Sequence, residues 1–435
     1  MISRRRFLEV SSVTAGMAVA SRSRVSAAVA EDADASLPPS LAKLKSRKGE
    51  ATPISREERH NRQERARQLM SENALDAILL MEGTSLRYFT GIRWWGGERT
   101  FALVLPAKGA AFYVCPAFEE GRAHEQIANS PDGNQADVRV WQEDESPYER
   151  IAQGLKERGI ASGKLGIEET VCFVFADGIA KAVSQAASQV TLTSATPVTA
   201  GCRMIKSPQE IALMRLAAEV TLAAYQAAHL AVKDGMTQTQ LQELVKKAHE
   251  RLGFIGGADV QVGEFSAFPH GSVTPQVVHQ GTIVLMDGGC AVEGYPSDIT
   301  RTFVLGKASD KMKSVFDIVL RAQSAALATA RPGAECGSVD AAARKVVSDG
   351  GYGPDYKYFT HRLGHGLGMD GHEWPYLVRG NPTKLQANMT TSNEPGIYIR
   401  GEFGVRIEDD MHITENGAAL FTPKPLSLEE PFGKA

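Results

Sequence analysis

Short apolar runs alternate with polar, helix-forming stretches along the first half of the chain. Residues 77–80 and 101–105 are continuous apolar runs, which predict strands buried on both faces, and residues 164–167 predict another strand. Helical patterns cover 56–72, 147–158 and 174–187. Strands that alternate with helices predict an α/β domain over 56–203.

The second half begins with a strong helix-start signal. Ser207 supplies an N-cap, Pro208 occupies the first helical position, and Glu210 stands three residues after the cap, which is the pattern of a capping box. Further helices are predicted over about 237–252, 310–331 and 338–349. A helix pair followed by strands thus occurs twice, which predicts an internal duplication. The fold class is α+β, with a second domain over 204–425 and a tail over 426–435.

The first thirty residues predict an export signal that is not part of the fold. Three arginines at 4–6 precede Phe7 and Leu8, a weakly apolar stretch follows over 10–20, and Ala28-Val29-Ala30 offers a cleavage site. This order resembles a bacterial twin-arginine signal peptide. We expect recognition by the twin-arginine export machinery, a periplasmic or secreted protein, and a loose leader over 31–55. The apolar stretch is too short to span a bilayer, so no stable membrane anchor is expected.

Composition narrows the function classes. The 435 residues carry 48 Lys and Arg against 51 Asp and Glu, and this balance gives no reason to expect a nucleic-acid partner. Five scattered cysteines without a CxxC pair argue against a disulfide scaffold and against a cysteine-ligated zinc site. We expect them to be mostly buried thiols.

Two aspartates mark the first candidate site. An apolar strand ends in Asp287, a turn is expected over Gly288 and Gly289, and a second strand carries Asp298. A hairpin between them would bring two carboxylates together, and such a pair repels unless a cation or a proton lies between them. Taken alone, the pair also fits one capping aspartate and one surface aspartate.

Histidines and glycines are interleaved over residues 359–373. His361, His365 and His372 lie in this segment, where glycine permits close backbone approach and histidine is a common metal ligand. The string from Gly366 to Gly371 also matches G-x-G-x-x-G. No apolar strand leads into it and no helix opens on it, so we reject a dinucleotide site.

A third candidate cluster follows near the end of the second domain. Glu394 precedes a proline, and apolar and charged residues alternate over 405–408, which places Arg406 and Glu408 on one strand face. A solvated edge strand is the alternative for that segment alone. The three clusters together supply four carboxylates and several histidines but no cysteine. This donor set suits Mn²⁺, Mg²⁺, Co²⁺, Fe²⁺ or Zn²⁺.

In this order, the clusters resemble the pita-bread metallopeptidase family M24, which includes methionine aminopeptidase, aminopeptidase P and Xaa-Pro dipeptidase (prolidase). The first domain and the phrase from Arg203 to Glu210 resemble the aminopeptidase P and prolidase branch, whose N-terminal domain is creatinase-like. The resemblance implies a C-terminal pita-bread domain of duplicated helix pairs and antiparallel strands. It also implies two divalent ions, Mn first and Co, Zn or Fe as alternatives, held by Asp287, Asp298, His365, Glu394 and Glu408.

The resemblance also implies roles around the metal ions. Glu394 would shuttle a proton, His372 would hydrogen-bond the oxyanion, and His270 and His361 would complete the catalytic group. Arg406 resembles an arginine that supports the bridging carboxylates.

Substrate contacts are less constrained by the resemblance. Arg379 and Arg400 are candidates for holding a dipeptide carboxylate, and either also fits a solvated surface position. Trp94 and Trp95 are candidates for closing the pocket of a neighbouring subunit in a homodimer, and ordinary core or interface packing is the alternative.

The implied reaction is hydrolysis of Xaa-Pro bonds in short proline-containing peptides by a metal-bridging hydroxide. A dipeptidase is slightly favoured over an aminopeptidase P because the chain has no long insertions. Arg362 and Leu363 stand where many members have smaller residues. They keep open a metal-dependent hydrolase or lyase acting on a small non-peptide substrate. A non-enzymatic peptide-binding module is disfavoured because all five ligand positions are filled.

Overall fold

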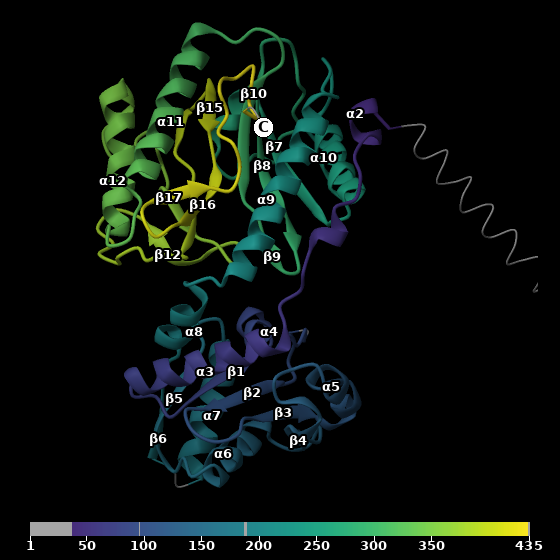
Figure 1. Cartoon of the computed structure of the whole chain (residues 1–435), viewed down its shortest axis with the longest axis vertical. Helices are drawn as coiled ribbons and strands as arrows, with labels where there is room; N and C mark the ends of the chain where they lie inside the picture. Colours follow the sequence, from purple (N-terminus) through teal and green to yellow (C-terminus); the bar gives the residue numbers. More distant parts are fainter. Residues whose placement is uncertain (1–36, 95, 187–188, 434–435) are drawn as a thin grey trace, which may run out of the picture.

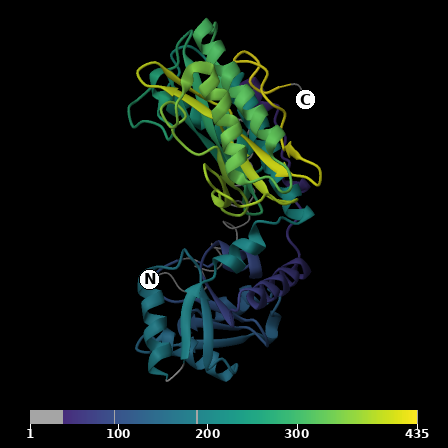
Figure 2. The same ribbon diagram turned by 90° about the vertical axis from the view of Figure 1, so that its left-hand side faces the viewer.

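Two groups of strands, divided near residue 204, build two lobes that lie one above the other (Figures 1 and 2). The computed structural model describes residues 37–94, 96–186 and 189–433 of the chain. The predicted export signal over 1–30 and the predicted role of Trp95 lie outside these described residues.

The first lobe is an α/β domain around one six-stranded sheet, in the order β4-β3-β2-β1-β5-β6. The predicted apolar runs form its centre, where every residue of β1 (Ala77–Met81) and β2 (Ala102–Pro106) is buried. The outer strands are β3 (Phe112–Pro116), β4 (Asp137–Trp141), β5 (Ser162–Ile167) and β6 (Gln189–Ser194). The α/β interpretation is confirmed.

Helices cover both faces of this sheet. One apolar cluster joins the sheet to residues of α3 and α8, and a second joins its other face to α6 and α7. The helices of this lobe are α3 (Arg56–Glu72), α4 (Thr84–Thr90), α5 (Glu120–Ile127), α6 (Pro147–Glu157), α7 (Phe173–Gln185) and α8 (Thr196–Arg203). Short 3-10 turns lie at Ala117–Glu119 and Gly133–Gln135.

The second lobe repeats one unit, a helix pair followed by strands. The first copy contains α9 (Pro208–His229), α10 (Gln238–Leu252), β7 (Gly256–Val262), β8 (Ile283–Val292), β9 (Tyr295–Pro296) and β10 (Ile299–Val304). The second copy contains α11 (Asp310–Thr329), α12 (Cys336–Val347), β11 (Gly364–Gly366), β12 (Glu373–Leu377), β13 (Thr390–Asn393), β16 (Asp409–Ile413) and β17 (Ala418–Leu420). A hairpin of β14 (Gly396–Ile399) and β15 (Phe403–Arg406) lies beside it. The expected duplicated α+β architecture is confirmed.

Capping boxes start both helices of the first copy. The Ser207 hydroxyl accepts a hydrogen bond from the Glu210 amide, and the Glu210 carboxylate accepts one from the Ser207 amide. Thr237 and Gln240 make the same reciprocal pair at the start of α10. Local sequence therefore fixes where this lobe begins.

The glycines after Asp287 do not form the expected turn. Strand β8 continues through Gly288 and Gly289 to Val292, and Asp298 stands just before β10 and not on a strand. A Cβ added at Gly289 would lie 2.0 Å from the carbonyl oxygen of Ser297, so this position requires glycine because two backbones approach closely. The actual turn lies at Glu293 and Gly294, both with positive φ.

The described part of the expected loose leader, residues 37–55, packs against the second lobe (Figure 1). It contains α2 (Pro39–Ala42) and a 3-10 turn at Lys48–Glu50. The Leu41 side chain is fully buried, and Ser40 donates a hydrogen bond to the Ala227 carbonyl at 2.7 Å. The expectation of a loose segment is therefore wrong here, because its few apolar side chains pack into the core of the second lobe. In the predicted tail, Leu428 and Phe432 are buried in the same way.

The described residues contain five free cysteines, of which Cys172 is exposed and the other four are buried. This agrees with the expected set of mostly buried thiols. Among the helices that the structure describes, none has the length and apolar character needed to cross a bilayer.

Candidate active site

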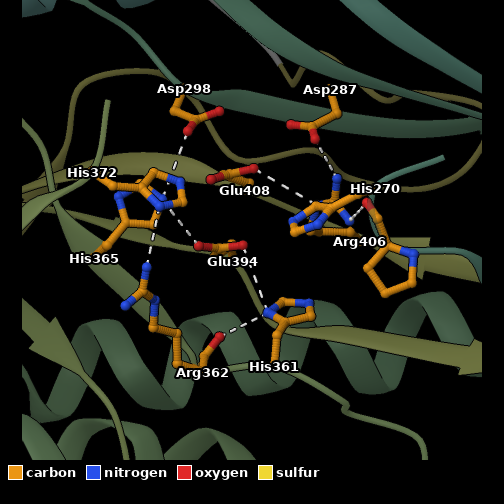
Figure 3. A pocket seen from close by; sticks show the side chains of 11 residues that line it. His270, Asp287, Asp298, His361, Arg362, His365, His372, Glu394, Arg406 and Glu408 are labelled. Carbon is orange, nitrogen blue, oxygen red and sulfur yellow. Dashed lines mark hydrogen bonds and ion pairs between the residues drawn. The ribbon is translucent and has the colours of Figure 1, made fainter. Parts of the chain in front are cut away.

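A cavity of about 220 Å³ opens in the second lobe, between the strands of its two copies. Figure 3 shows carboxylates, imidazoles and two guanidinium groups pointing into it. Its lining consists of Pro269, His270, Asp287, Asp298, His361, Arg362, His365, His372, Glu394, Arg406 and Glu408. All five predicted metal-binding residues and all predicted catalytic histidines are therefore brought together.

Two acidic ligand candidates converge around one hydroxyl group. Asp287 lies in β8 opposite Thr300 of β10, and Thr300 also bridges to Glu408 across the two copies. The Thr300 hydroxyl oxygen lies 2.8 Å from Oδ1 of Asp287 and 2.6 Å from Oε2 of Glu408. The hydroxyl has one proton and donates to one of these carboxylates at a time, so it lies between them as a shared contact.

His365 directs one ring nitrogen towards the carboxylates of Glu394 and Asp298. Its Nδ1 lies 3.1 Å from the Gly366 carbonyl, which holds a proton on Nδ1 and directs Nε2 towards the carboxylates. Nε2 lies 3.3 Å from Oε1 of Glu394 and 3.7 Å from Oδ2 of Asp298. Nε2 is therefore the nitrogen that a metal ion could bind.

The ligand atoms form three overlapping groups, each within 4.8 Å. One group contains Asp287, Asp298 and Glu408, and another contains His365, Glu394 and Glu408. Because Glu408 belongs to both, the donors fit two neighbouring divalent cations with a shared carboxylate. A set rich in oxygen donors, with imidazole and without thiolate, matches hard or borderline ions.

Burial and mutual repulsion govern the titration of these carboxyl groups. Burial, followed by the charges of neighbouring carboxylates, raises the pKa of Asp298 and of Glu408 well above the ordinary range. Burial also acts to raise the pKa of Glu394, but the hydrogen bond with His365 and the nearby positive charges outweigh it and bring that pKa to about 2. The site therefore favours a cation between Asp298 and Glu408, while Glu394 stays ionised.

Arg406 contacts the carboxylate cluster through Asp287 and Thr300. Its buried guanidinium donates to Oδ2 of Asp287 at 2.5 Å and to the Thr300 hydroxyl at 3.1 Å. It also donates to the Tyr398 hydroxyl at 2.9 Å and to the Pro269 carbonyl at 3.1 Å. All three nitrogens are thus engaged within the protein, so this cation is not free for a substrate.

His361 is held on both sides of its ring. Nδ1 lies 2.8 Å from the Arg362 carbonyl, and Nε2 lies 2.7 Å from the Tyr398 hydroxyl. The hydroxyl therefore donates to Nε2, because the carbonyl requires the proton on Nδ1. Tyr398 was not predicted, since a lone tyrosine among the apolar residues of β14 gives no signal in the sequence.

His372 stacks on His365, with ring centroids 3.7 Å apart, and Arg362 lies next to the two rings. Nη2 of Arg362 lies 3.1 Å from Nδ1 of His372. Burial and the charges of His365 and Arg362 lower the pKa of His372 to about 4. The ring is therefore neutral at pH 7, with Nδ1 as acceptor and a proton on Nε2.

The structure places other substrate-contact candidates away from the cavity. Arg379 is half-exposed and pairs with Asp355 at 2.9 Å, and Arg400 lies 3.9 Å above the Phe268 ring. Neither arginine belongs to the cavity lining, and a role of either in substrate binding stays a prediction. Trp94 stacks on Phe101 in the first lobe, with centroids 3.9 Å apart.

Comparisons with known proteins give matches over both lobes. Residues 212–415 match the model of Metallopeptidase family M24, and residues 62–205 match the Creatinase/Prolidase N-terminal domain. The chain is 32% identical to the putative dipeptidase YkvY of Bacillus subtilis over 85% of this chain and 99% of that protein. It is 34% identical to an Xaa-Pro dipeptidase of Lactobacillus delbrueckii subsp. lactis, over 81% and 94%.

Solved structures show the same relationship. Dipeptidase PepE from Mycobacterium ulcerans superposes with a TM-score of 0.80 at 32% identity, covering 87% of this chain and 99% of that one. The similarity extends over both lobes, and the candidate ligands lie within the matched segment. The chain belongs to metallopeptidase family M24 and carries the creatinase/prolidase type of N-terminal domain.

Proposed function

We propose that the protein is a dinuclear-metal exopeptidase that hydrolyses Xaa-Pro bonds and acts on dipeptides in preference to longer peptides. The observation that carries this proposal is the convergence of five candidate ligands with three histidines in one cavity. The relatives named as dipeptidases, which cover both lobes, support the substrate class.

Bound metal ions would supply Lewis acidity and lower the pKa of water. The protein's own groups divide the remaining work. Glu394, whose pKa is about 2, is ionised at neutral pH, accepts a proton from the attacking water on a carboxylate oxygen, and passes it to the proline nitrogen as the C–N bond breaks. His372 donates from Nε2 to the oxyanion, because Arg362 occupies its Nδ1.

Arg362 is the group best placed to hold a substrate carboxylate. Among the described residues it has no carboxylate partner, and it lines the cavity, whereas Arg406 is engaged on every nitrogen. One residue spans at most about 3.6 Å, so the carboxylate of a dipeptide lies within one residue length of the scissile bond. The Arg362 guanidinium lies 3.1 Å from His372, the residue proposed to contact the scissile carbonyl oxygen, so it is close enough to bind a carboxylate at that distance.

The test compares Ala-Pro, Ala-Pro-Ala and Ala-Ala as substrates of the metal-stripped protein reloaded with Mn²⁺, Co²⁺ or Zn²⁺, with Glu394→Gln as the inactive control. We expect hydrolysis of Ala-Pro above that of the tripeptide, and little hydrolysis of Ala-Ala. Equal cleavage of the tripeptide would instead identify an aminopeptidase P-like enzyme. A metal-loaded protein that cleaves neither proline peptide would contradict the proposal and favour a non-peptide substrate.

A matched pair of variants tests the carboxylate contact. Arg362→Gln should raise KM for Ala-Pro but leave KM for Ala-Pro amide, which lacks the carboxylate, nearly unchanged. Arg379→Gln is the control, because it removes an arginine that pairs with Asp355 outside the cavity. The reverse pattern would assign the contact to Arg379.

We also propose Mn²⁺ as the native metal, a homodimer as the assembly, and export by the twin-arginine route. The oxygen-rich donor set supports Mn²⁺, and the arginine run with Ala28-Val29-Ala30 supports export with cleavage after Ala30. The dimer rests on the family resemblance. Metal analysis after purification, light scattering, and export of a folded reporter fused to residues 1–30 test the three points.

A further inference from the structure

The linker between the two lobes contacts the loop that carries His372. The segment from Arg203 to Glu210 carries part of the family resemblance, but the proposed function assigns it no role. Arg203 ends α8, and Lys206 follows shortly after with only 2% of its surface exposed. A buried lysine requires a partner.

Both linker cations bind acidic residues that stand on either side of His372. Nη2 of Arg203 lies 2.5 Å from Oδ2 of Asp370 and 2.5 Å from Oε2 of Glu373. Nζ of Lys206 lies 2.7 Å from Oε1 of Glu373. We name these four residues, Arg203, Lys206, Asp370 and Glu373, the linker clamp.

The first lobe also reaches the linker clamp. Thr84, at the start of α4, donates a hydrogen bond to Oδ1 of Asp370 at 2.5 Å. Ser85 accepts one from Nη1 of Arg203 at 3.3 Å and contacts Glu168 through its hydroxyl. Asp370 is therefore held at once by the first lobe and by the linker.

The linker clamp fixes the chain immediately before and after His372. Glu373 begins β12 and pairs with Gly366, the neighbour of His365. The side chain of His372 is exposed, stacks on His365 and accepts a hydrogen bond from Arg362. The backbone from 370 to 373 sets where this side chain begins, so the linker clamp contributes to its position.

We propose that Arg203 is a positioning residue, which acts through Asp370 and Glu373 to place His372. Through this contact, the position of the first lobe affects catalysis. This inference rests on the proposed function, because it uses the role of His372. A misplacement of about 1 Å in such a group lowers the rate by up to about 100-fold. The alternative is a clamp that only joins the lobes.

Arg203→Lys separates these roles, because it keeps the charge but loses the fork that reaches two carboxylates. With Mn²⁺ and saturating Ala-Pro we expect kcat to fall by about 10-fold or more, with KM little changed, since the oxyanion contact is a transition-state interaction. Thr84→Val, which removes no charge, should give a smaller fall in kcat.

The control variant is Arg87→Gln. It removes another contact between the lobes, from Arg87 to the Glu293 carbonyl at 2.9 Å, and should retain kcat and KM. Thermal unfolding midpoints of all variants show whether each is folded at the assay temperature. Wild-type kcat in folded Arg203→Lys and Thr84→Val would overturn the inference.

A double-mutant cycle with His372→Ala completes the test. If Arg203 acts through His372, Arg203→Lys should lower kcat little further in the His372→Ala background. An equal fold-loss in both backgrounds would show that the clamp acts independently of His372. Wild-type protein that cleaves no Xaa-Pro peptide would overturn the proposed function and this inference together, whereas active wild type with additive losses overturns this inference alone.

Discussion

Arg406 donates a hydrogen bond from Nη2 to Oδ2 of Asp287 at 2.5 Å while it is almost fully buried. Arg406→Lys would keep a charge there but lose most of the contacts that orient Asp287 and Thr300. Because outer-shell partners tune metal affinity by about 10–100-fold, we expect a loss of that size. Competition with a chromophoric chelator measures it. Unchanged affinity would show that Asp287 is oriented without Arg406.

Without metal ions, the neighbouring carboxylates of the site should repel one another. Burial and neighbouring charges raise the pKa of Asp298, so the stripped protein should lose stability as the pH rises through that raised value. Asp298→Asn should raise the unfolding midpoint of the stripped protein by about 2–4 °C for each kcal/mol of repulsion relieved. The same variant should lose stabilisation by added Mn²⁺. A lower midpoint in stripped Asp298→Asn would contradict the repulsion.

Local signals in the sequence predicted the elements well where one pattern dominates. The apolar run at β1 and the capping box at Ser207 require no distant partner, and the helices and strands begin close to the expected positions. The five candidate ligands were identified by their order along the chain and converge as expected. Their roles as ligands remain a prediction.

Features that depend on distant contacts could not be predicted. Gly288 and Gly289 resemble a turn locally, but the backbone of Ser297 determines that a strand passes through them. Arg379 and Arg400 were the expected cations for a substrate carboxylate, and Arg362 was expected only to add bulk. The pairing of Arg379 with Asp355 and the place of Arg362 in the cavity lining are tertiary features that the sequence does not show. Leu41 likewise lies in a polar segment whose docking surface is formed by residues far along the chain.

The buried pair Arg301 and Asp409 predicts a large stability effect. Both side chains are fully buried, and Nη2 lies 2.6 Å from Oδ1. Arg301→Met leaves a buried carboxylate without its cation and should cost about 3–5 kcal/mol in the free energy of unfolding. Lys345→Met is the control, because its pair with Asp349 is exposed and contributes under about 0.5 kcal/mol. Urea titrations that show equal losses would contradict this assignment.

His249, which does not line the cavity, predicts a pH dependence of stability. Burial lowers its pKa to about 4, while the unfolded chain retains a value near 6.5. Between these values the unfolded state binds more protons, so stability falls as the pH falls. From pH 7 to pH 5 the loss should be about 2 kcal/mol. His249→Gln should show a smaller loss over that interval in denaturant titrations, and an unchanged loss would assign the dependence to other groups.

The distribution of the candidate ligands also has a consequence for folding order. They stand on both structural copies of the second lobe, from Asp287 in β8 to Glu408, which pairs with Thr300 only when the two copies meet. Contacts between segments so far apart in sequence form late in folding. The unfolded chain therefore offers no preassembled cage, and each half alone holds an incomplete donor set. Tight capture of two ions should follow the closing of the two copies, so the kinetics of metal uptake would report the last step of folding.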